Sequence, residues 1–204
     1  MKKIILHLCA DIGSDSYPYQ IDPMYEVIKI GKDIGVENYT PDRPIHGVIA
    51  NPVCTEFSTA SGFHKANTAP SLAMVQNCQR IIAECAPEWW VIENPANGTM
   101  RYYLGKPHFI YQPWEFGSPW TKKTALWGNF NIPVKLFLQW ENVQKNNKLY
   151  VRPGRPKPSL AFLHKSAIEY IPEFAPFTES ATTDNAFRSL CSQGFANAFK
   201  EVNP

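Results

Sequence analysis

The chain has 204 residues, a formal net charge of +2 and five cysteines. A chain of this length buries roughly 70% of its unfolded surface, so one domain with a substantial core is expected. The balance of 20 basic and 18 acidic residues excludes a prediction of a nucleic-acid or membrane partner from net charge alone. A nucleic acid, if bound, would contact a local basic patch.

The cysteines form no C-x-x-C pair, and none lies at zinc-ligand spacing from a histidine. Neither a disulfide framework nor a metal site is therefore expected. The apolar run that follows M1-K-K is too short for a secretory signal, and no stretch approaches the ~20 apolar residues of a membrane span. We expect a soluble cytoplasmic protein with no membrane contact.

Short apolar runs bounded by turn residues predict strands at 4–9, 27–30, 46–51 and 89–94. Between the last two, apolar residues recur three and four apart over 71–86, with a proline at each end, which predicts an amphipathic helix. Strands that alternate with a helix favour a mostly parallel sheet. Ligands of such sheets gather outside the carboxyl ends of the strands.

The second half of the chain has a different composition. Residues 109–133 are dense in aromatic side chains and prolines, and three basic residues and three prolines lie between Arg152 and Pro158. The latter segment is expected to be an exposed basic loop. Residues 186–200 are expected to form a turn and a short C-terminal helix. With no internal repeat and no long linker, we expect a single catalytic domain over 1–204.

An Asn-Pro pair follows two of the predicted strands, in N51-P-V-C-T-E-F-S58 and in E93-N-P95. A cysteine beyond one strand and an acid at the end of another could act as nucleophile and proton donor. Methylation of cytosine at carbon 5 needs that pair, because a thiolate adds to carbon 6 while an acid protonates N3. Taken alone, Cys54 is more often a small buried hydrophobe, and Glu93 is more often a solvated strand end.

The two motifs together resemble the Pro-Cys and Glu-Asn motifs of cytosine-5 DNA methyltransferases, in compact phage-type form. Two later stretches are similar to that family's basic strand motif and C-terminal motif, namely W114-E-F-G-S-P-W-T-K-K-T-A-L-W-G128 and R188-S-L-C-S-Q-G-F-A-N-A-F199. The resemblance implies an α/β, Rossmann-like methyltransferase fold that uses S-adenosylmethionine. It implies a mostly parallel sheet with helices on both faces, in abbreviated form.

The resemblance also implies residue roles. Cys54 would be the nucleophile, Glu93 the acid on N3, and Asn94 the residue that orients the acid. Substrate contacts would come from Thr55, Ser58, Lys122 and Lys123. S-adenosylmethionine would be bound by Asp11, Gly13, Ser14, Asp33, Ile34 and Asn51.

The sequence departs from the family's pattern at three places. Val53 and Thr55 flank the cysteine where proline and glutamine are usual. The turn L6-H-L-C-A-D-I-G-S14 has His7 where an acid is common and keeps only one glycine. A Pro-rich basic insertion at about 134–186 replaces the usual target-recognition domain.

These departures leave several functions open. We expect weakly sequence-specific DNA binding in the cytoplasm of a bacterial host cell, with phosphate contacts from Arg152, Arg155 and Lys157. A specificity partner or a homo-oligomer would supply further selectivity. A non-catalytic relative that binds nucleic acid or a nucleotide is the alternative. A methyltransferase acting on a free cytosine nucleotide is a third reading.

Overall fold

The computed structural model describes residues 2–57 and 69–204. The chain divides into two compact units, which we call unit 1 (1–110 and 124–130) and unit 2 (111–123 and 131–204). This division describes how the chain packs, and the expectation of a single catalytic domain stays a prediction. No helix within the described residues has the length and apolarity needed to cross a membrane.

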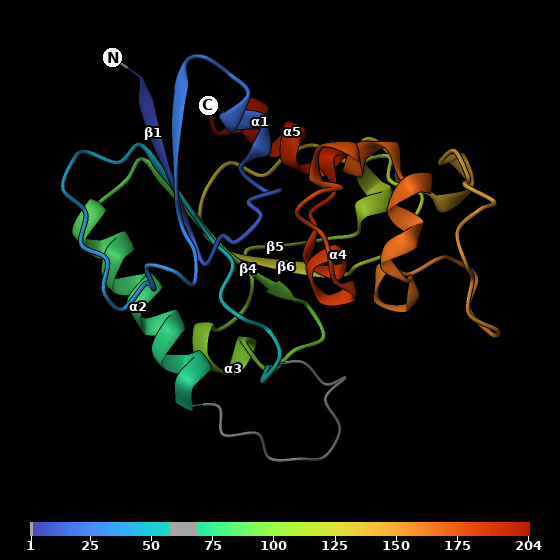
Figure 1. Cartoon of the computed structure of the whole chain (residues 1–204), viewed down its shortest axis with the longest axis horizontal. Helices are drawn as coiled ribbons and strands as arrows, with labels where there is room; N and C mark the ends of the chain where they lie inside the picture. The colour runs from blue at the N-terminus through green and yellow to red at the C-terminus, as the bar shows by residue number, and fades with distance from the viewer. Residues whose placement is uncertain (1, 58–68) are drawn as a thin grey trace. The chain divides into compact units, whose positions relative to one another are not determined.

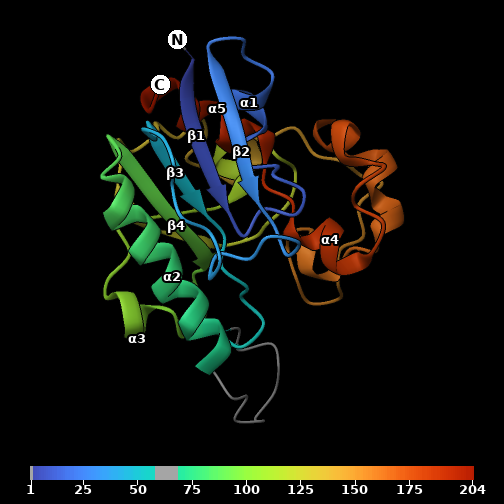
Figure 2. The same ribbon diagram turned by 60° about the vertical axis from the view of Figure 1, so that its left-hand side comes forward.

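A six-stranded sheet with the order β2-β1-β3-β4-β6-β5 dominates unit 1 (Figures 1 and 2). The first four strands of that order are mutually parallel, and β6 runs antiparallel to β4. The prediction of a mixed α/β fold is therefore confirmed, and the sheet is only partly parallel, because β6 pairs with β4 in the antiparallel direction. The strands are β1 (Lys3–Leu8), β2 (Tyr25–Ile30), β3 (Gly47–Ala50), β4 (Trp89–Pro95), β5 (Phe109–Tyr111) and β6 (Thr124–Asn129).

Helices pack on both faces of this sheet. The long helix α2 (Ala69–Cys85) places Cys78 and Ile81 in one core cluster with Leu6 of β1 and Ile92 of β4. Figure 2 shows α2 lying along that face of the sheet. On the other face, Tyr19 of the short helix α1 (Tyr17–Gln20) stacks on Trp89 with ring centroids 5.7 Å apart. Because successive side chains of a strand alternate between faces, His7 lies on the α1 face.

The predicted elements of unit 1 are confirmed with small shifts at their ends. The helix begins two residues earlier than the apolar pattern indicates, and β4 continues to Pro95 instead of ending at Asn94. Pro95 is tolerated there because it is the last residue of the strand, where it pairs with Thr124 of β6. A further short helix, α3 (Arg101–Leu104), lies between β4 and β5.

Unit 2 consists of short helical turns, longer irregular segments and two α-helices, α4 (Asp184–Ser189) and α5 (Gln193–Val202). The expected C-terminal turn and helix are confirmed by the end of α4 and by α5. The 3-10 helices of unit 2 are Pro113–Phe116, Trp140–Asn142, Leu160–Phe162, Lys165–Tyr170 and Pro172–Phe177. The core of this unit includes Tyr111 and Phe195, whose rings stack with centroids 3.8 Å apart.

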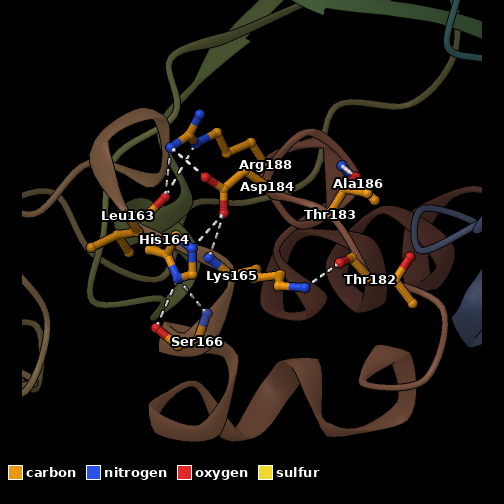
Figure 3. A network of polar contacts seen from close by, with 9 residues as sticks. All are labelled: Leu163, His164, Lys165, Ser166, Thr182, Thr183, Asp184, Ala186 and Arg188. Atoms are coloured by element: carbon orange, nitrogen blue, oxygen red, sulfur yellow. Dashed lines mark hydrogen bonds and ion pairs between the residues drawn. The ribbon is translucent and has the colours of Figure 1, made fainter.

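A polar network fixes α4 to the chain before it (Figure 3). Arg188 donates from Nε and Nη2 to the carbonyl oxygen of Leu163, at 3.1 and 3.0 Å. The Asp184 carboxylate accepts from the backbone N–H of Lys165 at 2.8 Å and lies 3.6 Å from Nε2 of His164. The N–H of Lys165 is the main cause of the lowered pKa of Asp184. Arg188 and Asp184 therefore link α4 to residues 163–165.

Candidate functional site

A chain of hydrogen bonds joins the carboxyl ends of β1, β3 and β4 on the α1 face of the sheet. Nε2 of His7 lies 2.6 Å from Oδ1 of Asn51, and Nδ2 of Asn51 donates to Oε2 of Glu93 at 3.2 Å. Asn51 is the first residue after β3, and its backbone N–H continues the pairing with β1 by donating to the carbonyl of Leu8. The parallel register therefore gathers three residues that lie far apart in the sequence.

The contacts of His7 define its tautomer. An amide oxygen only accepts hydrogen bonds, so Nε2 of His7 carries the proton that Asn51 receives. Nδ1 lies 2.7 Å from the hydroxyl oxygen of Ser16, and Nδ1 shares the single hydroxyl proton with the carbonyl of Gly13 at 3.1 Å. Both His7 and Ser16 are fully buried, with 1% and 0% of their surface exposed. Both ring nitrogens of a neutral His7 thus have a polar partner.

Burial is the main cause of the lowered pKa of His7, because the protonated ring would lose its hydration. The carboxylate of Asp15 and the hydrogen bond with Asn51 act in the opposite direction, and the Lys29 ammonium adds to the lowering. Lys29 itself has a lowered pKa because it is partly desolvated. Its Nζ donates to the carbonyl of Ile12 at 3.0 Å, which ties β2 to the loop after β1.

Two hydrogen bonds connect the cysteine loop to the strand that carries the predicted acid. Besides the bond from Asn51 to Glu93, Nδ2 of Asn94 donates to the carbonyl of Pro52 at 3.0 Å. Asn51 is therefore one partner of Glu93, and Asn94 holds the backbone two residues before Cys54. Asn94 is 1% exposed, and its Oδ1 has no hydrogen-bond partner among the described residues.

The segment after Asn51 presents Cys54 to solvent. Cys54 is exposed, and its carbonyl accepts from the N–H of Phe57 at 3.0 Å in a tight turn. Phe57 is fully buried and lies in a core cluster with Val75 of α2. The fixed end of the turn therefore supports an exposed cysteine residue. Thr55 is also exposed, and Ser58 lies outside the described residues.

The loop after β1 contains the predicted cofactor residues and is held by Lys29. Gly13 has φ +79°, and a Cβ at that position would lie 2.6 Å from Cε of Lys29. Ser14 is buried, and its hydroxyl lies 3.4 Å from Oδ2 of Asp15. This turn therefore requires glycine for its backbone angle and for its close approach to Lys29.

The loop after β2 lies beside it. Asp11 accepts from the N–H of Lys32 and forms an ion pair with the Lys32 ammonium, both at 3.1 Å. A Cβ on Gly31 would lie 3.1 Å from a carboxylate oxygen of Asp11 and from one of Asp33. The structure therefore brings Asp11 and Asp33 to one place. Ile34 is 43% exposed next to them.

Lys122 and Lys123 belong to unit 2. Nζ of Lys122 donates to the carbonyls of Ser189 and Leu190 at 2.9 and 3.1 Å, at the carboxyl end of α4. That position is favourable for a cation, because the last carbonyls of a helix lack partners in the helix itself. Lys123 is exposed.

Four residues of this network were not predicted as site residues: His7, Asp15, Ser16 and Lys29. One signal was present in the sequence, because a histidine inside the apolar run I4-I-L-H-L-C9 needs buried partners. The sequence does not reveal which residues those partners are. No group of three His, Cys, Asp or Glu side chains in the described part of the chain could hold a metal ion.

Comparisons with known proteins give matches among solved structures alone. No family model matches the chain, and no curated protein matches it. A solved structure from E. coli, described provisionally as a DNA modification methyltransferase encoded within a prophage, is similar with a TM-score of 0.46 and 15% sequence identity. The similarity covers 76% of this chain and 56% of that one, so the chain spans about half of its length.

Proposed function

We propose that the chain transfers a methyl group from S-adenosylmethionine to carbon 5 of cytosine in DNA, through a covalent adduct on Cys54. The pair of hydrogen bonds from Asn51 to Glu93 and from Asn94 to Pro52 supports the proposal most directly. These bonds fix the loop of the predicted nucleophile to the strand of the predicted acid. The reaction requires a fixed distance between the two, because the sulfur and the acid must reach one small ring at the same time.

Each residue has a defined task in this reaction. The sulfur of Cys54 adds to carbon 6 of the ring while Glu93 protonates N3, which makes carbon 5 nucleophilic. As carbon 5 takes the methyl group, N3 returns its proton to Glu93. A base then removes the proton from carbon 5 and the sulfur of Cys54 leaves as a thiolate, so the aromatic ring is restored. The exposed position of Cys54 suits an attack on a base that has left the helix stack.

Asn51 is the positioning residue of the acid. The side-chain Nδ2–H of Asn51 donates to Oε2 of Glu93. Because Oε2 acts as the acceptor, Oε1 carries the acid proton in this proposal. Asn51 is itself oriented by the buried His7, whose Nε2–H fixes the amide oxygen. His7 thus donates to Asn51 and Asn51 donates to Glu93, which is the proton donor of the reaction. Ser16 contacts the other nitrogen of His7.

The residues of the two loops after β1 and β2 fit the cofactor. The approach of the Asp11 and Asp33 carboxylates at Gly31 offers acceptors for ribose hydroxyls, and the exposed side chain of Ile34 offers an apolar contact for adenine. Bound there, S-adenosylmethionine supplies an electrophilic methyl group. We assign Gly13, Ser14 and Asn51 to the same pocket as part of this proposal.

Methyl transfer to DNA tests the proposal. Purified chain is incubated with S-adenosylmethionine labelled in its methyl group and with duplex DNA, and 5-methylcytosine is measured after digestion. Glu93→Gln is expected to lower the rate by roughly 100- to 10,000-fold. The matched control is Glu88→Gln, a largely exposed carboxylate just before β4, which should keep the wild-type rate. Absence of 5-methylcytosine with the wild-type chain would contradict the proposal.

A non-catalytic nucleic-acid or nucleotide-binding relative is the second candidate, and the ion pair of Asp11 with Lys32 favours it. That contact engages the acid which would otherwise face a cofactor. Calorimetry with S-adenosylmethionine separates the two functions, since only the enzyme needs to bind it. The same methylation assay with a cytosine mononucleotide in place of DNA tests the third reading.

A further inference from the structure

The basic residues of unit 2 are concentrated in one segment. Between residues 142 and 168 the chain has six Lys and Arg residues and no Asp or Glu, although the whole chain carries a net charge of only +2. Figure 1 draws this segment in gold to orange as irregular chain with short helical turns. A local positive field therefore exists that the net charge conceals.

Aromatic rings hold several of these cations in place. Nζ of Lys157 lies 4.6 Å from the ring centroid of Trp114 and 5.2 Å from that of Trp140. The two tryptophan rings meet edge to face, with centroids 6.4 Å apart. The guanidinium of Arg152 lies 4.7 Å from the centroid of Phe162. An aromatic ring attracts a cation without neutralising it, so the full charge stays available.

We use the name cation-aromatic surface for these groups together with Lys148, which lies 5.0 Å from the ring centroid of Tyr170, and the exposed Arg155. Among the residues that the structure describes, no carboxylate pairs with Lys148, Arg152, Arg155 or Lys157. Lys145 differs, because its Nζ donates to the carbonyls of Trp140 and Val143. Four cations are therefore available to a partner.

The backbone that carries them is anchored on both sides. Thr121 pairs with Ser159 in an isolated bridge, and its N–H donates to the carbonyl of Pro158 at 3.0 Å. Leu149 and Leu160 are buried, with 4% and 1% of their surface exposed. The loop between these buried points thus presents its charges from fixed ends, which lowers the entropy that a partner must overcome.

We propose that the cation-aromatic surface binds the phosphate backbone of duplex DNA and reads no bases. This inference rests on the proposed function, because DNA is the polyanion that the reaction requires. A cation already lies over each of the rings of Trp114, Trp140 and Phe162, so a base that stacks there would compete with that cation, whereas a phosphate would be attracted by it. Unpaired Lys and Arg side chains provide phosphate contacts, which position a protein without specifying a sequence.

Salt dependence gives the expected size of the effect. Four phosphate contacts predict a slope of about −3.6 for the logarithm of affinity against the logarithm of salt concentration. The affinity for a duplex should then fall roughly 150-fold between 50 and 200 mM salt. Removing three of the four charges should reduce this loss to roughly 3-fold.

The test is fluorescence anisotropy with the full chain and a labelled 20-base-pair duplex, without cofactor. The triple variant Arg152→Gln, Arg155→Gln, Lys157→Gln should reduce the magnitude of the salt slope by about 2.7. The control variant Lys2→Gln, Arg43→Gln, Lys106→Gln removes the same charge from unit 1 and should keep the wild-type slope. Two unrelated duplex sequences should bind the wild-type chain with equal affinity.

Two further variants keep the test decisive. The double variant Arg152→Gln, Arg155→Gln changes only exposed loop positions, so its fold should be preserved. The magnitude of its salt slope should decrease by about 1.8. Arg152→Lys, Arg155→Lys keeps the charges and should bind like the wild type. Circular dichroism verifies that each variant is folded.

Several outcomes would overturn the inference: an unchanged slope in the folded double variant, an equal loss in the unit 1 control, or tighter binding of single strands than of duplex. Binding of phosphatidylserine vesicles but not of DNA would assign the surface to a membrane. The assay is independent of catalysis. A chain that binds duplex through this surface but fails to methylate it refutes only the proposed function, whereas methylation with unaltered variant binding refutes only the surface.

Discussion

Replacing Asn51 by alanine should damage both stability and activity, because its amide is the centre of the hydrogen-bond chain. The buried Nε2–H of His7 loses its acceptor at 2.6 Å, which costs ~1–3 kcal/mol. The two longer bonds, to Glu93 at 3.2 Å and to Asp15 at 3.4 Å, add about 0.5 kcal/mol each. We expect a loss of about 3 kcal/mol in the free energy of unfolding.

In a chain of this length such a loss lowers the melting temperature by roughly 6–12 °C. Thermal unfolding followed by circular dichroism measures it, and methyl transfer at 25 °C measures the effect on Glu93. The transfer rate should fall at least 10-fold in the folded variant, as expected for a misplaced general acid.

The matched control is Asn77→Ala on α2. The half-buried Asn77 amide contacts only its own helix, where it donates to the carbonyl of Ala73 at 3.0 Å and accepts from Nε of Arg80 at 3.3 Å. Its loss should change stability by no more than about 0.5 kcal/mol and leave methylation intact. If Asn51→Ala has the same melting temperature as the control variant and methylates at the wild-type rate, the hydrogen-bond chain neither stabilises the fold nor positions the acid.

Two further predictions concern the same face of the sheet. His7 has a lowered pKa in the folded chain, so below its ordinary value of 6.5 the unfolded chain binds a proton that the folded chain does not. Stability should therefore fall as the pH drops below about 6.5, and the difference in stability between wild type and His7→Gln in urea titrations should change with pH below that value and stay constant above it. Gly13→Ala should be more destabilising than Gly105→Ala in the same titrations, because both have positive φ but only the first meets Lys29. Equal losses in the two glycine variants would refute the clash with Lys29.

The strands of unit 1 could be predicted because their signals are local. The runs around Leu6 and Ile92 are apolar, and Asn51-Pro52 and Asn94-Pro95 mark where two of them end. Parallel order then places these ends at one edge of the sheet, as the register confirms. The neighbourhood of the Cys54 loop and Glu93 follows from local patterns together with one topological rule.

The partners within that neighbourhood could not be predicted. Nothing near His7 in the sequence indicates that its ring meets Asn51, because the contact depends on the register of β1 against β3. The resemblance gave Asn94 the task of orienting the acid, whereas the structure shows Asn51 bonded to Glu93. Both asparagines precede a proline, and only the pleat of the strands decides which one faces the acid.

Unit 2 shows the limit of sequence patterns more clearly. The basic loop from Arg152 to Pro158 was predicted as exposed and irregular. The structure confirms that it is irregular and that residues 152–156 are exposed, whereas Lys157 is half-buried and Pro158 is buried. The packing of Lys157 on Trp114 joins an irregular segment to a short 3-10 helix far away in the sequence, and no sequence periodicity indicates such a contact. The position of Lys122 at the carboxyl end of α4 likewise depends on tertiary packing.

The most direct test of the central claim is the mass of the protein after incubation with S-adenosylmethionine and duplex DNA containing 5-fluorocytosine. Fluorine at carbon 5 cannot leave as a proton does, so the adduct on carbon 6 persists. We predict that the intact mass rises by one DNA strand and that digestion maps the bond to Cys54, while Cys54→Ser forms none. An unchanged mass, or an adduct on another cysteine, would contradict the proposed mechanism.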